Sequence, residues 1–204
     1  MQLYISSIGA FLGLSGLDLV TAARRERIRA FRRAEDKARC LGAGLLLRRV
    51  CGVTENRQLV YGSHGKPYLR DNAMRFNLSH SGDYVVLATA GCEVGVDIER
   101  IESYSDAVAI RCFTPAEREW LSNNEGFYRL WTAKESVMKG AGLGFSLPPE
   151  SFSVLPIDTS AHRIAGKDWF LDWIAFDGHM ICRALGGKAE QTEFIEIGAS
   201  ELLL

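Results

Sequence analysis

The run from residue 93 to residue 99 restricts the fold of this chain more than any other stretch, because its side chains alternate in polarity without a break. Such alternation is typical of a β-strand, whose successive side chains point to opposite faces of the sheet. The apolar face carries Val94, Val96 and Ile98. We expect Asp97 and Glu99 to lie side by side on the polar face, where Gly95 leaves open space beside them.

The segment from residue 127 to residue 139 has the periodicity of a half-buried helix. Its apolar residues recur one or two helical turns apart and are Phe127, Leu130, Trp131, Val137 and Met138. Glu135 and Lys139 are four positions apart, so they are neighbours on one flank of the helix. Taken alone, this pair would be an ordinary surface ion pair. Together with the alternating strand, it suggests two side chains that face a shared ligand.

The rest of the chain predicts a mixture of strands and helices. Strands are expected over residues 2–8, 75–78, 84–90, 152–157, 169–176 and 179–185. Helices are expected after Thr21, over residues 34–50, and after Thr114, where Pro115 and Glu117 complete a helix-start pattern. Residues 79–83 are expected to form the loop of one hairpin, and residues 177–178 the turn of another.

A weak internal repeat suggests that the chain has two related halves. Residues 82–91 resemble residues 178–187, and the triplet at residues 42–44 recurs at residues 140–142. The offsets are similar, at 96 and 98 residues. Each half would combine a helix with antiparallel strands.

The composition limits the class of protein. With 204 residues, of which 47% are hydrophobic and 24% charged, the chain is globular and large enough for a real core. A formal charge of -1 argues against nucleic acid as a partner, although arginines are concentrated between residues 24 and 33. The five cysteines show no disulfide or zinc-ligand spacing, which favours reduced thiols in the cytoplasm. No apolar run is long enough to span a membrane, and no basic leader precedes the first strand.

The acidic residues point to magnesium and a phosphate substrate. Asp97, Glu99 and Glu135 would supply three hard oxygen ligands, and magnesium held by few carboxylates takes phosphate oxygens as further ligands. A salt-bridge network with Arg100 or Lys134 explains the same residues equally well. Lys66, His80, Lys139 and the arginine run could bind the phosphates, although each of these is also typical of a solvated surface.

Five motifs in order resemble the 4′-phosphopantetheinyl transferases of the Sfp (surfactin-synthetase activator) type. They are Gly65-Lys66-Pro67, Phe76-Asn77-Leu78-Ser79-His80-Ser81, Gly95-Val96-Asp97-Ile98-Glu99, Phe113-Thr114-Pro115-Ala116-Glu117 and the segment from Trp131 to Lys139. The similarity extends from about residue 24 to residue 154.

The resemblance implies an α+β fold, a pseudo-twofold monomer whose similar halves each pack a helix on a small antiparallel sheet. The expected halves are residues 1–101 and 102–204. The implied reaction transfers the 4′-phosphopantetheine arm of coenzyme A to a serine of an apo acyl or peptidyl carrier protein. It is Mg²⁺-dependent and releases adenosine 3′,5′-bisphosphate.

The resemblance also assigns roles to residues. Asp97, Glu99 and Glu135 would hold Mg²⁺, and the catalytic residues would be Glu135, Lys139 and Asp97. Coenzyme A would be bound by Arg24, Arg27, Arg39, Lys66, Pro67, Ser79, His80 and Lys139. Arg24 and Arg27 stand where the family has lysines, and Cys40 stands where it has a hydroxyl residue, which affects the expected contacts with the nucleotide.

In the expected mechanism, Glu135 takes the proton of the carrier serine, directly or through water, while Lys139 neutralises the diphosphate. The acidic carrier would dock near Arg111, Arg118 and the loop of residues 140–149. Two alternatives stay open: a module that binds coenzyme A or carrier protein without turnover, and a magnesium phosphohydrolase that needs no protein acceptor.

Overall fold

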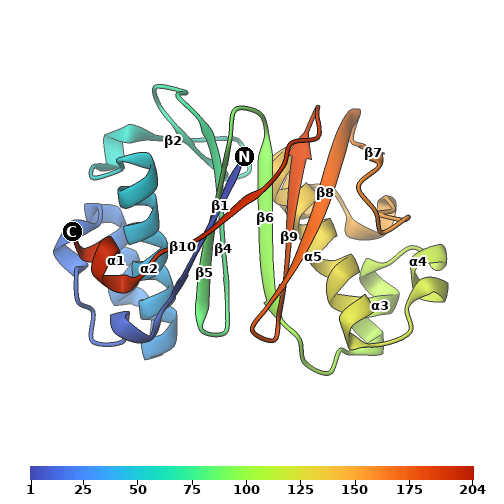
Figure 1. Cartoon of the computed structure of the whole chain (residues 1–204), viewed down its shortest axis with the longest axis horizontal. Coiled ribbons are helices and arrows are strands. Elements are labelled where there is room, and N and C mark those ends of the chain that lie inside the picture. Colours follow the sequence, from blue (N-terminus) through green and yellow to red (C-terminus); the bar gives the residue numbers. More distant parts are fainter.

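The structure is a computed structural model that describes residues 1 to 204. Two four-stranded sheets pack against each other in the middle of the molecule, and a long helix covers the outer side of each sheet (Figure 1). The strand order is β10-β1-β5-β4 in the first sheet and β6-β9-β8-β7 in the second. The expected α+β class is therefore confirmed.

The elements have the following bounds. The first sheet contains β1 (Gln2–Ser7), β4 (Arg75–Ser81), β5 (Tyr84–Ala90) and β10 (Glu193–Glu196). The second contains β6 (Val94–Arg100), β7 (Ala161–Ile164), β8 (Lys167–Phe176) and β9 (His179–Gly186). A separate hairpin is formed by β2 (Leu59–Tyr61) and β3 (Pro67–Leu69). The helices are α1 (Ala22–Ala30), α2 (Ala34–Cys51), α3 (Asp106–Cys112), α4 (Pro115–Trp120), α5 (Asn124–Ala141) and α6 (Ala199–Leu203).

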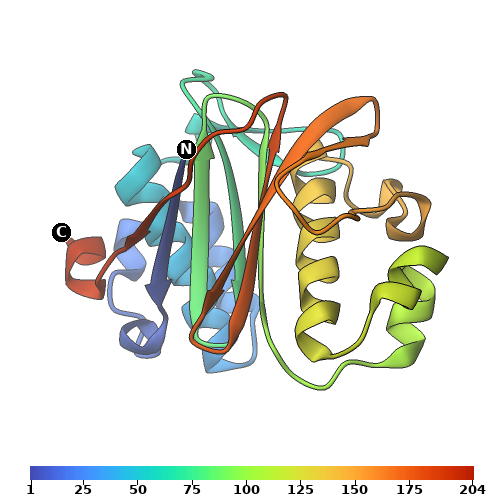
Figure 2. The same ribbon diagram turned by 45° about the vertical axis from the view of Figure 1, so that its right-hand side comes forward.

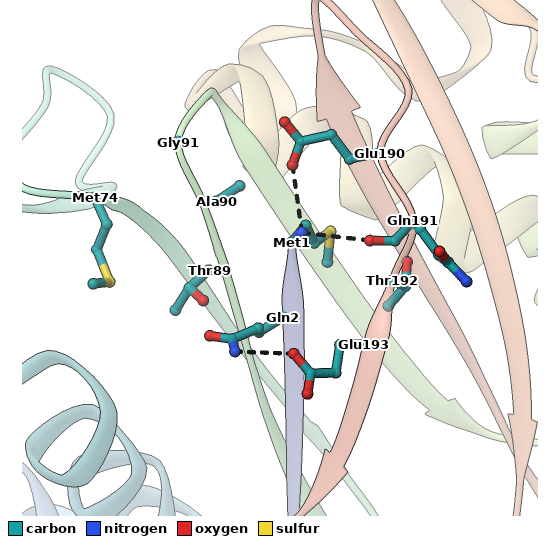
Figure 3. Close-up of a pocket in the computed structure, with 10 residues that line it drawn as sticks. All are labelled: Met1, Gln2, Met74, Thr89, Ala90, Gly91, Glu190, Gln191, Thr192 and Glu193. Carbon is teal, nitrogen blue, oxygen red and sulfur yellow. Dashed lines mark hydrogen bonds and ion pairs between the residues drawn. The ribbon is translucent and has the colours of Figure 1, made fainter.

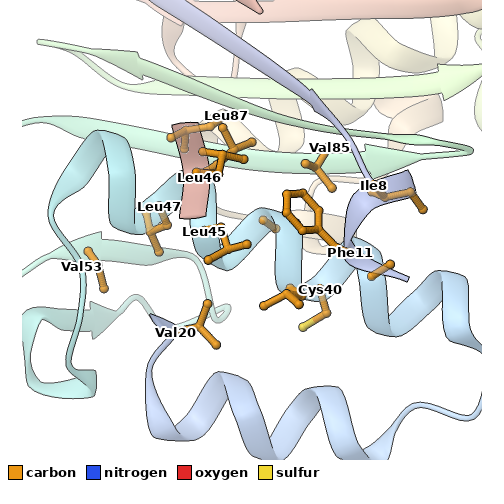
Figure 4. Close-up of a cluster of buried hydrophobic side chains, with 14 of the residues drawn as sticks. Ile8, Phe11, Val20, Cys40, Leu45, Leu46, Leu47, Val53, Val85 and Leu87 are labelled. Atoms are coloured by element: carbon orange, nitrogen blue, oxygen red, sulfur yellow. The ribbon is translucent and has the colours of Figure 1, made fainter. Parts of the chain in front are cut away.

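Three apolar clusters hold the layers together. The first lies between α2 and the first sheet, where Phe11 and Leu46 pack near Val85 (Figure 4). The second lies under α5 around Trp169, and the third joins the two sheets through residues such as Val86 and Val96. Each fully buried side chain of this size contributes about 1.5–3 kcal/mol, so the clusters are the main stabilising contribution.

The α5 helix lies directly on β6, because glycines remove the side chains between their backbones. A Cβ atom on Gly95 would collide with the carbonyl oxygen of Ser136 and lie 2.5 Å from the amide nitrogen of Gly140. A Cβ atom on Gly140 would in turn lie 2.6 Å from the ring of Trp169. Figure 2 shows α5 running along the outer side of the second sheet. The polar face of β6 is therefore held against a helix, and the open space expected beside Gly95 is filled by the backbone of α5.

Strands β4 and β6 come from different sheets and are joined by side chains instead of a backbone ladder. Asn77 Oδ1 accepts a hydrogen bond from the Val96 amide at 2.9 Å. Ser79 Oγ donates to Asp97 Oδ1 and Ser81 Oγ donates to Glu99 Oε2, each at 2.8 Å. Because the residue numbers of the two strands increase together along these contacts, the strands run in the same direction. We call this row of contacts the β4–β6 seam.

Several predicted elements are confirmed with their local causes. Thr21 accepts a hydrogen bond from the Arg24 amide at the start of α1, and Thr114 and Glu117 form a reciprocal capping box at the start of α4. Residues 177 and 178 both have positive φ angles, 43° and 70°, and form the turn between β8 and β9. The long helices predicted over residues 34–50 and 127–139 are α2 and α5.

Two predictions of secondary structure are wrong. Residues 152–157 form no strand, since the Val154 amide donates its hydrogen bond to the Glu117 carboxylate and not to a neighbouring strand. The strand predicted to end at Leu78 continues to Ser81, so Ser79 and His80 lie on β4 and only residues 82–83 form the turn. In addition, strand β10 and helix α6 were not predicted.

The last segment of the chain returns to the first sheet. Strand β10 pairs in parallel with β1, and Gln2 donates a hydrogen bond to Glu193 across this pair (Figure 3). Strand β6, expected in the first half, pairs with β9 in the second sheet. The twofold relation between halves and their division at residue 101 stay predictions. No helix combines the length and the apolar character needed to cross a bilayer.

Candidate functional site

Asp97 is the centre of the site, and its carboxylate is 2% exposed. The pleat of β6 turns it away from the core between the sheets, toward α5 and the β4–β6 seam. One oxygen, Oδ1, accepts hydrogen bonds from Ser79 Oγ at 2.8 Å and from Lys139 Nζ at 2.5 Å. The other oxygen, Oδ2, is buried and has no hydrogen-bond partner. A buried carboxylate oxygen without a partner is costly and suits an additional cation.

Lys139 connects the helix to the strand. Its ammonium group forms an ion pair with Asp97 and a 3.0 Å hydrogen bond to Ser79, while 29% of its side chain stays exposed. Burial lowers its pKa, but the charges of Asp97, Glu135 and Glu99 outweigh that effect and raise the pKa above its ordinary value. The lysine is therefore a permanent positive charge at the mouth of the site.

Glu99 lies two residues further along the same face of β6. Burial, together with the nearby negative charge of Asp97, raises the pKa of Glu99 to about 7, against the effects of Ser81, Lys139 and Trp131. The like charges of Asp97 and Glu99 are thus close enough to interact. Their repulsion is relieved by a proton or by a cation.

Glu135 lies one helical turn before Lys139 and is half-buried. Burial and the charge of Asp97 raise the pKa of this carboxyl group, and Lys139 opposes the shift. A carboxylate with a raised pKa is a better proton acceptor than an ordinary one. The structure therefore brings Asp97, Glu99, Glu135 and Lys139 into one electrostatic cluster, as their spacing indicated.

His80 and Arg39 lie on the α2 side of β4. Arg39 donates one hydrogen bond to the Gly82 carbonyl and another to Asp36 Oδ1, both at 2.7 Å. The pKa of His80 is lowered by partial desolvation and by the positive charges of Arg39, Lys139 and Arg27. These cations belong to one positive region that continues from Lys139 to α1, which is a suitable arrangement for an extended anion.

Arg24 and Arg27 border a cavity of about 120 Å³ between α1, α2 and β2. Arg24 Nη1 donates to the Cys40 carbonyl at 3.2 Å and lies 3.9 Å from the thiol sulfur. Burial lowers the pKa of Arg24. The side chain crosses α2 at Gly44, where a Cβ atom would collide with it. Cys40 is therefore placed beside the guanidinium that the resemblance assigns to the nucleotide end.

Lys66 and Pro67 stand at the start of β3, away from the seam. The Lys66 amine is buried and donates to the carbonyl oxygens of Gly140 and Val94 at 2.7 Å and 3.0 Å. The donors of this amine are already used within the protein. A direct contact between the amine and coenzyme A stays a prediction. Pro67 pairs with Tyr61 across the β2–β3 hairpin.

A buried ion pair was missed by the sequence reasoning. Lys134 Nζ lies 2.8 Å from Glu117 Oε2, and both side chains are fully buried. Lys134 also donates to the carbonyl oxygens of Pro149 and Phe152. Arg100 instead pairs with Glu102 at 3.8 Å. The salt-bridge network once considered for the site carboxylates therefore does not involve Arg100 or Lys134.

An apolar groove of about 700 Å³ adjoins the site through Trp131. Its walls are formed by α3 and by the loop after α5, where 68% of the Phe145 side chain is exposed. Arg111 and Glu150 are the charged residues at its rim. Arg118 is not among the lining residues; it donates to the backbone carbonyls of Ile110 in α3 and of Phe113 just after it. Another cavity, of about 680 Å³ beside β1 (Figure 3), contains none of the predicted site residues.

The donor set fits a hard divalent cation only with help from other ligands. No three of the histidine, cysteine, aspartate and glutamate side chains form a metal cage by themselves. Asp97 Oδ2 is nevertheless a buried oxygen that lacks a partner, and burial, followed by the charge of Asp97, raises the pKa of the neighbouring Glu99. Magnesium commonly keeps several waters and substrate oxygens around one or two carboxylates, so the residues present are compatible with it.

Comparisons with known proteins agree with this geometry. The family model of the 4′-phosphopantetheinyl transferase superfamily matches residues 93–189, and the model of a 4′-phosphopantetheinyl transferase N-terminal region matches residues 14–92. The chain is similar to the 4′-phosphopantetheinyl transferase ffp of Bacillus subtilis, with 39% identity over 68% of this chain and 67% of that protein. It is also similar to the 4′-phosphopantetheinyl transferase Sfp of Bacillus subtilis strain 168, with 34% identity over 68% and 67%. A putative 4′-phosphopantetheinyl transferase of Synechocystis shares 36% identity over 79% of this chain and 76% of its own length.

Proposed function

The chain belongs to the 4′-phosphopantetheinyl transferase superfamily and is a transferase of the Sfp type, and on this premise we propose what its donor, acceptor and metal are. The donor is coenzyme A, and the acceptor is a serine of an apo acyl or peptidyl carrier protein. The second product is adenosine 3′,5′-bisphosphate, and the reaction depends on Mg²⁺. We further propose that the protein acts as a monomer in the cytoplasm.

The observation that carries this proposal is the environment of Asp97. This buried carboxylate has one oxygen bound to Lys139 and Ser79 and one oxygen without a partner. The ion pair with Lys139 uses Oδ1 only, so Oδ2 stays available as a ligand. A donor with a diphosphate and a bound cation would use both the free oxygen and the exposed part of Lys139.

The residues have separate tasks in this proposal. Asp97, Glu99 and Glu135 would hold Mg²⁺, which would supply positive charge to the diphosphate. Lys139, with Ser79 beside it, would contact the same phosphates. Arg39 would extend the positive region along the donor, and His80, whose lowered pKa favours the neutral ring, would contact the phosphates as a hydrogen-bond donor. Arg24 and Arg27 receive the nucleotide end near the small cavity behind α1. Binding is thus spread along one anionic ligand.

Glu135 is proposed to accept the proton of the carrier serine, directly or through water. The serine oxygen forms a bond to the β-phosphorus, and the bond from that phosphorus to the bridging oxygen breaks. Adenosine 3′,5′-bisphosphate leaves with the bridging oxygen, whose negative charge Lys139 stabilises. Positioning and charge stabilisation provide most of the rate, as in other phosphoryl transfers.

The carrier protein is proposed to dock over the apolar groove. Phe145 and the apolar wall of α3 offer contact area, and Arg111 at the rim suits an acidic partner. The groove continues to Trp131, which lies near Glu99. A carrier serine held there would approach the carboxylate cluster from the side of α5.

Mass spectrometry of purified apo carrier proteins incubated with enzyme, coenzyme A and Mg²⁺ tests the function. We expect a mass gain equal to one phosphopantetheine group, and its loss when Mg²⁺ is chelated. Glu135→Gln is expected to abolish transfer while leaving measurable binding of coenzyme A. A Glu135→Gln enzyme that keeps most of its activity would refute the assignment of the base, and release of product without any carrier would favour a phosphohydrolase.

A further inference from the structure

Lys66 is a buried lysine whose amine contacts three different segments. Its side chain is 5% exposed, and Nζ lies 2.7 Å from the Gly140 carbonyl, 3.0 Å from the Val94 carbonyl and 3.5 Å from Glu93 Oε2. An ammonium group has three donors, so these acceptors account for all of them. Nothing in this arrangement leaves a donor directed toward the carboxylate cluster.

The two carbonyl groups that accept from Lys66 mark the ends of the elements that build the site. Val94 is the first residue of β6, which carries Asp97 and Glu99, and Gly140 follows Lys139 in the last turn of α5. The Gly140 carbonyl is one of the last four in the helix and therefore lacks an intrahelical partner. A cation is favourable at this end of a helix, because the helix dipole is negative there.

The contact between α5 and β6 depends on close backbone packing near this point. Gly95 and Gly140 bring the two backbones together, and a Cβ atom on Gly142 would lie 3.0 Å from Tyr68 Oη and 3.2 Å from Lys66 Cδ. Lys66, just before β3, and Tyr68 on β3 thus cover the end of α5 from the side. The bonds of Lys66 to the Gly140 and Val94 carbonyls form a polar link between the end of the helix and the start of the strand.

We propose that Lys66 is a positioning residue that sets the distance between Lys139 and Asp97 by joining the end of α5 to the start of β6. The inference rests on the proposed function, in which these two residues act on the donor phosphates. It differs from a direct contact between Lys66 and coenzyme A. The amine acts through two backbone carbonyls and holds the 2.5 Å ion pair of Lys139 and Asp97 in place.

The test compares Lys66→Met with Lys188→Met. The second substitution removes the same charge from a lysine whose side chain is 70% exposed and pairs with Glu190. Three quantities are measured for each variant and for the wild type: hydrogen exchange of the Gly142 and Leu143 amides, the Kd of coenzyme A by calorimetry, and kcat and KM for carrier loading. The two amides are informative because they bond to the Lys139 and Met138 carbonyls at the end of α5.

For Lys66→Met we expect the exchange protection of both amides to fall by about tenfold or more, since that turn opens locally. We expect kcat to fall by about 10²-fold, as a small displacement of Lys139 costs that much, with the Kd of coenzyme A within about threefold of wild type. Lys188→Met is expected to leave all three unchanged. Lys66→Arg, which can still donate to both carbonyls, should recover part of the protection and of kcat.

Two results would overturn the inference. Unchanged protection of Gly142 and Leu143 in Lys66→Met would show that the amine does not hold the end of α5. A large rise in the Kd of coenzyme A with kcat preserved at saturation would show a direct contact with the donor. If Lys66→Met does not fold, the same measurements on Lys66→Gln decide the question, because its shorter side chain cannot reach both carbonyls. The exchange measurement needs no substrate, so it tests Lys66 even if the wild type loads no carrier protein.

Discussion

Replacing Lys134 by Met should destabilise the protein strongly, although the motif from Trp131 to Lys139 suggests a catalytic segment. The wild-type pair of Lys134 and Glu117 has both side chains fully buried at 2.8 Å. Glu117 keeps its bonds from the Thr114 and Val154 amides in the variant, but it loses its only counter-ion. Breaking a buried pair by removing one partner costs about 3–5 kcal/mol, because a buried charge remains.

The size of this effect follows from the groups that the substitution leaves without a partner. Besides its ion pair with Glu117, Lys134 donates hydrogen bonds to the carbonyl oxygens of Pro149 and Phe152. A buried polar group that loses its partner costs about 1–3 kcal/mol. The loss of these two bonds therefore adds to the cost of the unpaired carboxylate.

Urea denaturation of the wild type and the variant at pH 7 measures this loss. We expect Lys134→Met to lower the free energy of unfolding by about 3–5 kcal/mol. Arg129→Met is the matched control, because its ion pair with Glu125 is exposed and contributes less than about 1 kcal/mol. A Lys134→Met protein that loses less than about 1 kcal/mol would refute the reasoning. Combining Lys134→Met with Glu117→Gln should restore much of the loss.

Two further predictions concern the carboxylate strand. The pKa of Glu99 is raised to about 7 in the folded protein. The protonated carboxyl group therefore favours folding when the pH is below the ordinary pKa of glutamate, and this contribution is lost as pH rises through about 7. Mg²⁺ should therefore raise Tm more at pH 8 than at pH 6. An equal shift in Tm at both values of pH would contradict the role of this carboxylate. The same contradiction would follow if Glu99→Gln kept the wild-type difference between the two shifts. Gly95→Ala should lower stability by about 1–3 kcal/mol or more, because its Cβ atom would collide with the Ser136 carbonyl and force α5 away from β6. Its Tm and carrier-loading rate should both fall, and a stable, fully active variant would show that the helix does not need this close approach.

Local patterns predicted those parts of the fold that short-range physics decides. The alternation of residues 93–99 predicted the strand and the shared face of Asp97 and Glu99, and Thr114 with Glu117 predicted the start of α4. Lys134 was also visible in the sequence, but its partner was not. Glu117 lies 17 positions earlier on a separate helix, so no helical or strand spacing relates the two residues.

Long-range pairings were the part that the sequence did not reveal. Strand β10 joins β1 across almost the whole chain, and nothing in residues 193–196 specifies a partner. The β4–β6 seam left a faint signal in the polar residues Asn77, Ser79 and Ser81, which recur with the period of a strand. Because a loop was expected over residues 79–83, that period was not recognised. Lys66 was interpreted through its motif, while its burial depends on three segments that are distant in sequence.

The position of the site follows from the way in which the two sheets meet. Strands β4 and β6 lie side by side without a backbone ladder, so polar side chains must satisfy the seam. Ser79 does this by donating to Asp97, and Lys139 reaches the same oxygen from α5, which leaves Asp97 Oδ2 as the group that the protein does not satisfy. The contacts that join the sheets are thus the same contacts that prepare a carboxylate for a cation. A substitution such as Ser79→Ala should therefore weaken both, and measuring Tm with and without Mg²⁺ separates the loss at the seam from the loss at the metal site.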